Sequence, residues 1–261
     1  MAGIVEFYEA LEALSFHRMK NNIKVLRKII SGVDRLRVLT GAGISAESGI
    51  PTFRGAGGVW RNYEIEDVAT PEAFARNPEL VWEFYNWRRK LISNVHFNPG
   101  HKALAYLENH INDFTLITQN VDGLHREAGT KNLLEIHGNL WEVKCTGCGL
   151  ITTDRSQDMG RLPRCTECKG LLRPNVVWFG ESLDPDILRK ALDAAGNCDL
   201  MLIIGTSGMV QPAASLSFEA KSKGSLLAEI NIEETPQSGI MDFVLTGESG
   251  KILPMLVEGL G

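Results

Sequence analysis

The chain has 261 residues, of which 44% are hydrophobic, and its 27 Lys and Arg against 32 Asp and Glu give a net charge of −5. This composition is typical of a globular protein with one large domain and a smaller module. Apolar runs stay well short of the ~18 residues that span a bilayer, and there is no basic block that could neutralise a nucleic-acid backbone. We therefore expect no membrane insertion and no nucleic-acid partner.

The cysteines and the amino-terminal segment indicate a reducing compartment. Five cysteines are an odd number, and four of them form two C-x-x-C pairs, a pattern that favours metal binding over disulfides. The first thirty residues contain Glu6, Glu9 and Glu12 among apolar residues, unlike a secretory signal or a transit peptide. We therefore expect a cytoplasmic protein.

Short apolar runs alternate with amphipathic stretches, which is typical of a parallel sheet with helices on both faces. The segments predicted as strands are 36–40, 114–118, 200–204, 226–232 and 243–245. Helices are predicted at 71–92, 99–110, 185–195 and 211–223, and proline begins three of them, as it often does in a first helical turn. The sequence thus predicts an α/β fold.

Two insertions interrupt this alternation, at 49–96 and around the cysteines at 144–172. We expect them to form a smaller zinc-ribbon and helical domain beside the sheet. The predicted boundaries are 1–48, 97–140 and 174–261 for the sheet domain, 49–96 for a loop and helical insertion, and 141–173 for the zinc-ribbon module.

The paired cysteines have the spacing of a zinc site. Sixteen residues separate Cys145 and Cys148 from Cys165 and Cys168, within the range typical of four-thiolate sites. Four protein ligands leave no open position for water, so the spacing favours a structural metal over a catalytic one. The fifth cysteine, Cys198, precedes an apolar run and is interpreted as a buried residue.

A glycine-rich turn follows the first predicted strand. Residues 41–46, Gly-Ala-Gly-Ile-Ser-Ala, satisfy G-x-G-x-x-G/A, in which glycines allow the backbone to approach a pyrophosphate. The pattern alone could also be a plain tight turn, but its place after a strand favours a dinucleotide site. The next segment, 49–55, is a proline- and glycine-punctuated loop, and a ribose-binding carboxylate is not evident. An ordinary hydride-transferring dehydrogenase therefore fits poorly, and the loop, with Phe53 and Arg54, is either a cofactor cover or a surface turn.

Polar side chains follow the second predicted strand. Residues 118–125, Thr-Gln-Asn-Val-Asp-Gly-Leu-His, stand at a strand's carboxyl end, where open α/β sheets bind ligands. Further along, His137 lies between an apolar run and a glycine. A lone histidine is more often structural than catalytic, but its place just before the zinc module favours a role in the site.

Six motifs in order resemble the sirtuin family of NAD-dependent protein deacylases, and the match runs from about residue 38 to the carboxyl terminus. They are residues 41–45, 49–54 and 118–122, His137-Gly138, the paired C-x-x-C, and 205–207. The resemblance implies a Rossmann-like NAD-binding domain, a small domain with one structural zinc, and a cleft between them that takes NAD and an acyl-lysine peptide. The loop within 49–96 would cover the cofactor.

The resemblance also implies residue roles. The residues matching the family's cofactor contacts are Gly41, Ala42, Gly43, Ile44, Ala46, Thr52, Phe53, Arg54, Trp60, Gln119, Asn120, Asp122, Gly205, Thr206, Ser207, Asn231, Ile232 and, more loosely, Ser249. The chemistry needs a base that accepts a ribose hydroxyl proton near neutral pH, which suits the imidazole of His137. Asn120 and Asp122 would orient the sugar.

Two further segments resemble the family's substrate contacts. Within 176–181, we expect Val177, Phe179, Gly180 and Glu181 to pair with an extended peptide, although an ordinary internal strand is the alternative. Tyr85 and Arg88, three residues apart on a predicted helix, match the Tyr-x-x-Arg signature of the class III sirtuin branch that prefers acidic acyl groups. The alternative is a Tyr85 packed in a helix interface and an Arg88 paired with solvent or a nearby Glu.

The expected function is NAD-dependent removal of succinyl, malonyl or glutaryl groups from protein lysines, with acetyl removed more weakly. The products would be nicotinamide and O-acyl-ADP-ribose, the protein partner an acyl-lysine substrate, and the enzyme a monomer. Two alternatives stay open at this point: a protein ADP-ribosyltransferase that uses the same cleft, and a non-catalytic NAD sensor.

Overall fold

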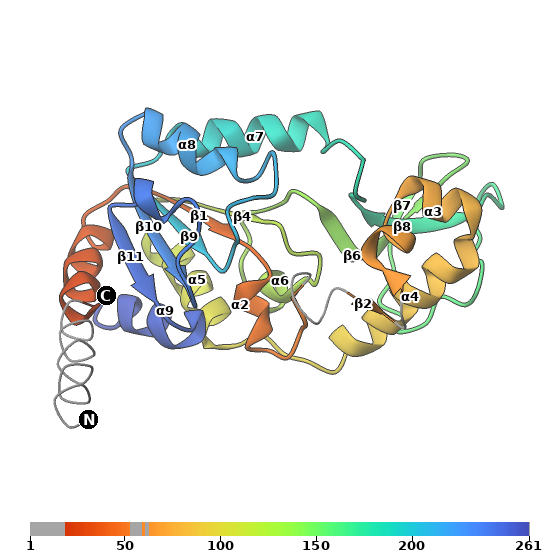
Figure 1. Cartoon of the computed structure of the whole chain (residues 1–261), viewed down its shortest axis with the longest axis horizontal. Coiled ribbons are helices and arrows are strands. Elements are labelled where there is room, and N and C mark those ends of the chain that lie inside the picture. Colours follow the sequence, from red (N-terminus) through yellow and green to blue (C-terminus); the bar gives the residue numbers. More distant parts are fainter. Residues whose placement is uncertain (1–18, 53–58, 61–62, 261) are drawn as a thin grey trace, which may run out of the picture.

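The structure is a computed structural model that describes residues 19–52, 59–60 and 63–260 (Figure 1). The strands are β1 (Arg35–Thr40), β2 (Val59–Trp60), β3 (Tyr63–Glu64), β4 (Asp113–Thr118), β5 (Leu133–Glu135), β6 (Gly138–Cys145), β7 (Ile151–Thr153), β8 (Leu172–Val176), β9 (Leu200–Ile204), β10 (Leu226–Asn231) and β11 (Phe243–Thr246). The helices are residues 19–30, α2 (Gly43–Ala46), α3 (Pro71–Arg76), α4 (Pro78–Ile92), α5 (Pro99–His110), α6 (Leu124–Glu127), α7 (Pro185–Ala195), α8 (Ser215–Ser222) and α9 (Ser249–Val257), with single 3₁₀ turns η1 (Ile65–Asp67) and η2 (Ser238–Ile240).

The large domain is built on a six-stranded sheet in the order β11-β10-β9-β1-β4-β5, and every neighbouring pair is parallel. All five predicted strands lie in it, which confirms the α/β, Rossmann-like fold. The chain runs outward from β1 in one direction through β4 and β5, and from β9 in the other through β10 and β11. The carboxyl ends of β1 and β9 therefore meet at a topological switch point, where such sheets bind ligands.

Helices cover both faces of this sheet. Along β9, Leu200, Leu202 and Ile204 face residues 19–30, α5 and α9, whereas Met201 and Ile203 face α7 and α8 (Figure 1). Successive side chains of a strand point to opposite faces, so burial on both faces explains the unbroken apolar run. Among the described residues, the helices are too short or too polar to cross a membrane.

A smaller unit combines both insertions. Helices α3 and α4 pack against the antiparallel sheet β7-β6-β8 around a shared apolar core, to which α4 contributes Val81 and Trp82 and β6 contributes Leu140. The fully buried Arg89 ties the two parts together, because its guanidinium donates to the carbonyl groups of Leu140, Asp154 and Ser156. β6 begins at Gly138 and β8 ends at Val176, so this sheet extends beyond both ends of the segment 141–173.

Two helices differ from the sequence prediction. The predicted helix 71–92 is two helices, because Asn77 adopts φ −151° and ψ 80°, ends α3 and caps α4 by accepting a hydrogen bond from the backbone of Leu80. Pro78 follows it and has no N–H to continue a helix. The predicted helix 211–223 is regular only from Ser215 to Ser222, after a cis Gln211–Pro212 bond.

Candidate active site

The glycine-rich turn lies at the switch point in direct contact with the turn after β9. The backbone N–H of Gly41 donates to Ile204 O at 3.0 Å, and that of Gly43 donates to Gly205 O at 2.8 Å. A Cβ on Gly43 would stand 2.6 Å from Gly205 Cα, and Gly205 has a φ of +58°, a conformation that favours glycine. The turns therefore fit closely only without side chains, and leave bare backbone where a pyrophosphate would bind.

Ser45, in the helical turn α2, connects two of the predicted catalytic residues. Its hydroxyl donates to Asp122 Oδ2 at 2.8 Å and accepts from Asn120 Nδ2 at 3.1 Å. The same Asn120 amide donates to Gly41 O at 3.0 Å. Because both Asn120 and Asp122 are buried, these bonds satisfy them and fix their orientation at the edge of the glycine turn. Ser45 belongs to a predicted motif, but the sequence prediction gave it no role.

The Asp122 carboxyl is held from several directions. The side-chain Oδ1 accepts from the backbone N–H of Leu124 at 2.9 Å, and the main-chain carbonyl oxygen of Asp122 accepts from Trp141 Nε1 at 2.9 Å. Burial raises the pKa of Asp122, while the bonds from Leu124 and Ser45 and the positive charge of Arg88 act to lower it. Arg88 therefore lies close enough to this carboxyl to interact with it electrostatically.

The predicted adenosine-side residues link three strand ends. Gln119, after β4, donates to Thr206 Oγ1 at 2.9 Å, and Asn231, at the end of β10, donates to Thr206 O at 3.0 Å. Ile232 is 70% exposed, so an apolar side chain is available beside this group. Ser249 lies apart from these bonds: its hydroxyl donates to Glu47 Oε1 at 2.6 Å, an interaction that sequence reasoning missed.

His137 lies between the cofactor-side and peptide-side segments. Its Nδ1 is 3.0 Å from Gln119 O, and its own carbonyl accepts from Val177 N at 2.9 Å. A carbonyl only accepts, so Nδ1 carries the proton and Nε2 keeps the lone pair that a base needs. Burial lowers the pKa of His137, and the bond to Gln119 acts to raise it.

A pair of buried histidines lies next to Ser45, and the sequence prediction gave neither of them a role. The rings of His101 and His125 have centroids 4.8 Å apart; His101 Nε2 is 3.4 Å from Ser45 Oγ, and His125 Nε2 is 2.9 Å from Thr40 Oγ1. Burial lowers the pKa of His101 to about 4 and that of His125 well below its usual range. Both rings are therefore neutral near pH 7.

The predicted peptide segment lies outside any strand, since β8 ends at Val176. Phe179 is 49% exposed, and its N–H donates to Ala69 O. The Glu181 carboxylate accepts two bonds from Arg173, at 2.6 and 2.8 Å, and one from Trp178 N at 2.9 Å. Glu181 thus holds the segment in place through Arg173 and the backbone of Trp178.

Tyr85 and Arg88 both come from α4 and lie close to each other. Tyr85 is 5% exposed, its hydroxyl accepts a hydrogen bond from Trp178 Nε1 at 2.9 Å, and burial raises its pKa to about 12. Burial also lowers the pKa of the Arg88 guanidinium, against the opposing effects of Tyr85 and Asp122. The pair therefore lies between Asp122 and the segment that begins at Val177.

The four paired cysteines form one cluster, with all sulfur atoms within 4.8 Å of one another. The Sγ atoms of Cys145 and Cys168 are 3.3 Å apart and those of Cys148 and Cys165 are 3.8 Å apart, near the roughly 3.8 Å edge of a tetrahedron with Zn–S bonds of about 2.3 Å. Backbone N–H groups, that of Cys148 first, lower the pKa of Cys145 and favour its thiolate, while the backbone of Leu150 acts to lower the pKa of Cys148 and hydrogen bonds to the neighbouring thiols raise it. The cluster fits a structural zinc.

Phe53 and Arg54 lie outside the described residues, and for Trp60 the structure describes only a backbone position in β2. Thr52, which precedes them, is partly buried.

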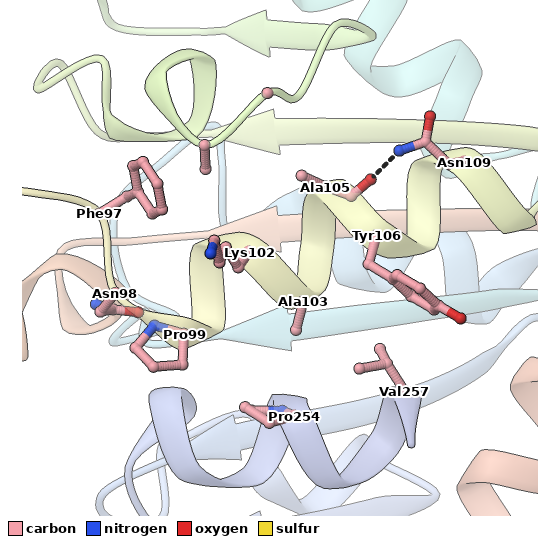
Figure 2. Close-up of a pocket in the computed structure, with 12 residues that line it drawn as sticks. Phe97, Asn98, Pro99, Lys102, Ala103, Ala105, Tyr106, Asn109, Pro254 and Val257 are labelled. Carbon is pink, nitrogen blue, oxygen red and sulfur yellow. Dashed lines mark hydrogen bonds between the residues drawn. The ribbon is translucent and has the colours of Figure 1, made fainter. Parts of the chain in front are cut away.

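A cavity of about 730 Å³ between α5 and α9 is separate from these residues (Figure 2). Its lining includes Phe97, Tyr106 and Pro254 but none of the predicted site residues. Figure 2 shows the Asn109 amide bonded to the carbonyl of Ala105 on its own helix, at 2.9 Å. The cavity is therefore distinct from the site at the strand ends.

Comparison with known proteins agrees with this geometry. Residues 41–212 match the Sir2 family. An NAD-dependent protein deacylase of Pyrococcus furiosus is 52% identical over 88% of this chain and 95% of its own length. The mitochondrial NAD-dependent protein deacylase sirtuin-5 of the dog is 45% identical over 91% of this chain and 85% of its own length.

Two solved structures are similar throughout. A Sir2 homologue in complex with NAD has a TM-score of 0.87 and 45% identity and covers 91% of this chain and 93% of its own. A mutant Sir2 homologue in complex with 2′-O-acetyl ADP ribose has a TM-score of 0.86 and 46% identity, and it covers 91% of this chain and 95% of its own. With a family match over most of its length and relatives near half identity, this chain belongs to the Sir2 family, the sirtuins.

Proposed function

We propose that this sirtuin is an NAD-dependent protein deacylase that prefers acidic acyl groups, namely succinyl, malonyl or glutaryl, on lysine. The deacylase activity follows from the family and from close relatives named as NAD-dependent protein deacylases. The acidic preference rests on one observation: Arg88 and Tyr85 lie together between the Asp122 carboxyl and Trp178 of the peptide segment. Acetylated lysine would be a weaker substrate.

The residues of the switch point fit NAD. The bare backbone of Gly41, Gly43 and Gly205 would take the pyrophosphate, and Asn120 and Asp122 would take the nicotinamide-side ribose. Bound NAD supplies a nicotinamide–ribose bond that breaks and a ribose that accepts the acyl group, with nicotinamide and O-acyl-ADP-ribose as products. A homologue's complex with 2′-O-acetyl ADP ribose supports this outcome.

His137 is proposed as the base. Because its Nδ1–H donates to Gln119 O, Nε2 is free to accept a ribose hydroxyl proton. Its lowered pKa keeps the imidazole neutral near pH 7. The backbone bond from Val177 N to His137 O joins this residue to Val177, the first of the predicted peptide-binding residues Val177, Phe179 and Gly180.

Arg88 would select the acyl group. Its guanidinium presents several donors in a fixed plane, which suits a carboxylate, and burial strengthens such an interaction. Tyr85 adds a neutral hydroxyl donor beside it. An acyl group that ends in a methyl offers neither side chain an acceptor, whereas a carboxylate can accept from both, and this difference separates acidic from neutral substrates.

The test compares R88M with K90M, a control on the same helix whose exposed ammonium pairs with Asp158. On peptides of one sequence, we expect R88M to lower kcat/KM for succinyl-lysine at least roughly 30-fold, the low end for truncating one partner of a buried charge pair. The loss on acetyl-lysine should be much smaller, and K90M should change neither. Equal losses on both peptides would reject the acidic preference, and ADP-ribose retained on the protein target would indicate the transferase instead.

A further inference from the structure

Trp178 is fixed on three sides, although it belongs to no strand or helix. Trp178 is 3% exposed, and its ring centroid lies 5.2 Å from that of Phe74 and 3.5 Å from the guanidinium carbon of Arg173. Arg173 is itself held by two bonds to Glu181. The indole N–H is thereby aimed at Tyr85 Oη, 2.9 Å away.

This contact determines how the Tyr85 hydroxyl can hydrogen-bond. An indole nitrogen is only a donor, so Tyr85 Oη must be the acceptor. The hydroxyl proton of Tyr85 therefore points away from Trp178. Arg88, the other polar side chain of the pair, carries only donors and cannot accept that proton either.

The proton stays on Tyr85 over the whole physiological range. Burial raises the pKa of Tyr85 to about 12, against the lowering effect of Arg88. Tyr85 is therefore a neutral donor that is buried next to a cation and needs an acceptor. A carboxylate in front of Arg88 would supply it.

We propose that Trp178 is a positioning residue for acyl-group selection: its N–H occupies the acceptor side of Tyr85 Oη and directs the Tyr85 proton to the carboxylate of an acidic acyl group. The inference rests on the proposed function and adds to it a residue outside the Tyr-x-x-Arg pair. An acetyl group gives the directed proton no acceptor, so Trp178 matters less for deacetylation.

The first test is W178F, which removes the N–H and keeps an aromatic ring between Phe74 and Arg173. We expect kcat/KM for a succinyl peptide to fall about tenfold, mainly through KM, as for the loss of one hydrogen bond to a charged group. The loss on an acetyl peptide of the same sequence should be about twofold or less. A benzothienylalanine at position 178, which keeps the two-ring shape without an N–H, should give the same split even if W178F folds poorly.

A double-mutant cycle with Y85F separates positioning from general packing. If Trp178 acts through the Tyr85 hydroxyl, W178F in the Y85F background should cause little further loss on the succinyl peptide. F74L, which loosens the packing of the Trp178 ring but leaves its N–H, is the control and should lower kcat/KM for both peptides alike. Additive losses in the cycle, or equal losses of W178F on both peptides, would overturn the inference.

The same measurements distinguish failure of this inference from failure of the proposed function. If the wild-type protein and Y85F both handle succinyl and acetyl peptides equally, the acidic preference itself is wrong. If the wild type prefers succinyl and Y85F loses that preference while W178F retains it, only the role of Trp178 is wrong.

Discussion

Gly205 Cα lies 2.6 Å from the point where a Cβ on Gly43 would stand, so the turns after β1 and β9 meet backbone to backbone. The N–H of Gly43 also donates to Gly205 O at 2.8 Å. The surface offered to a dinucleotide at the switch point therefore depends on the absence of two side chains.

We predict that G43A weakens both folding and NAD binding. The added methyl has no room, and overpacking of this kind costs about 1–3 kcal/mol of unfolding free energy, or roughly 2–10 °C in Tm. The KM for NAD should rise at least about tenfold, the effect of 1.4 kcal/mol in binding. Thermal unfolding and steady-state kinetics measure the two effects.

G239A is the matched control, because a Cβ at Gly239 would meet nothing within 4 Å. Its unfolding free energy should stay within about 0.5 kcal/mol of the wild type. If G43A behaves like G239A in both measurements, the contact with Gly205 does not shape the cofactor site.

We predict that H137A lowers kcat about 10²- to 10⁴-fold, the usual contribution of a general base, and leaves NAD binding and zinc content unchanged. In the wild type, the acid limb of the pH profile of kcat/KM should have its midpoint below pH 6.5. The reason is that burial lowers the pKa of His137 and the base must be neutral to act.

H96A serves as the control, since the His96 side chain is 85% exposed. It should retain wild-type kcat and the same acid limb. Normal turnover of H137A would exclude the imidazole as the base.

We predict one zinc ion for each chain and loss of the smaller unit when it is removed. Structural zinc contributes folding free energy, so C145S or strong chelation should lower Tm and abolish activity. Metal analysis and thermal unfolding with and without chelator measure this. C198A is the control, because Cys198 lies outside the cluster and contacts Ser225 at 3.3 Å. A zinc-free C145S protein with full activity would contradict a structural metal.

We predict that stability falls between pH 6.5 and 4, in part because of His101. Its pKa is about 4 in the folded protein and near 6.5 when unfolded, so the unfolded state binds more protons in this window and stability drops as pH falls. Protonation would occupy Nδ1, which accepts from Asn98 N at 3.3 Å.

From pH 6.5 to 5, His101 accounts for about 2 kcal/mol of that loss. Urea unfolding should therefore show H101Q losing about 2 kcal/mol less than the wild type over this interval. H96Q, at an exposed position, should follow the wild type. An identical pH dependence in all three proteins would mean that His101 titrates normally.

The elements that were predicted well are those with a local sequence signal, either an apolar pattern or residues typical of a helix start. Residues 200–204 form a continuous apolar run because both faces of β9 are covered. Helices α5 and α7 begin and end as predicted, since each has proline in its first turn after a capping Asn98 or Asp184.

Other elements depend on contacts far along the chain. β5 is three half-buried residues that pair with β4, and α9 contains Pro254, which argues against a helix when only the sequence is read. The break at Asn77 was missed because the apolar pattern continues through it.

In the site, too, features with a local sequence signal were predicted, and contacts between distant parts of the chain were not. The motifs predicted which residues gather at the strand ends, such as Asn120 and Asp122, but not that Ser45 would bridge them. The bond from Trp178 to Tyr85 joins residues 93 positions apart, and no local pattern records it.

The central claim is tested most directly with one peptide sequence carrying succinyl-, malonyl-, glutaryl- or acetyl-lysine, incubated with the protein in the presence and absence of NAD and followed by mass spectrometry. We predict that removal requires NAD, is faster for acidic groups than for acetyl, and yields nicotinamide and O-acyl-ADP-ribose in equal amounts. Removal at the same rate without NAD, or acetyl removed as fast as every acidic group, would contradict it.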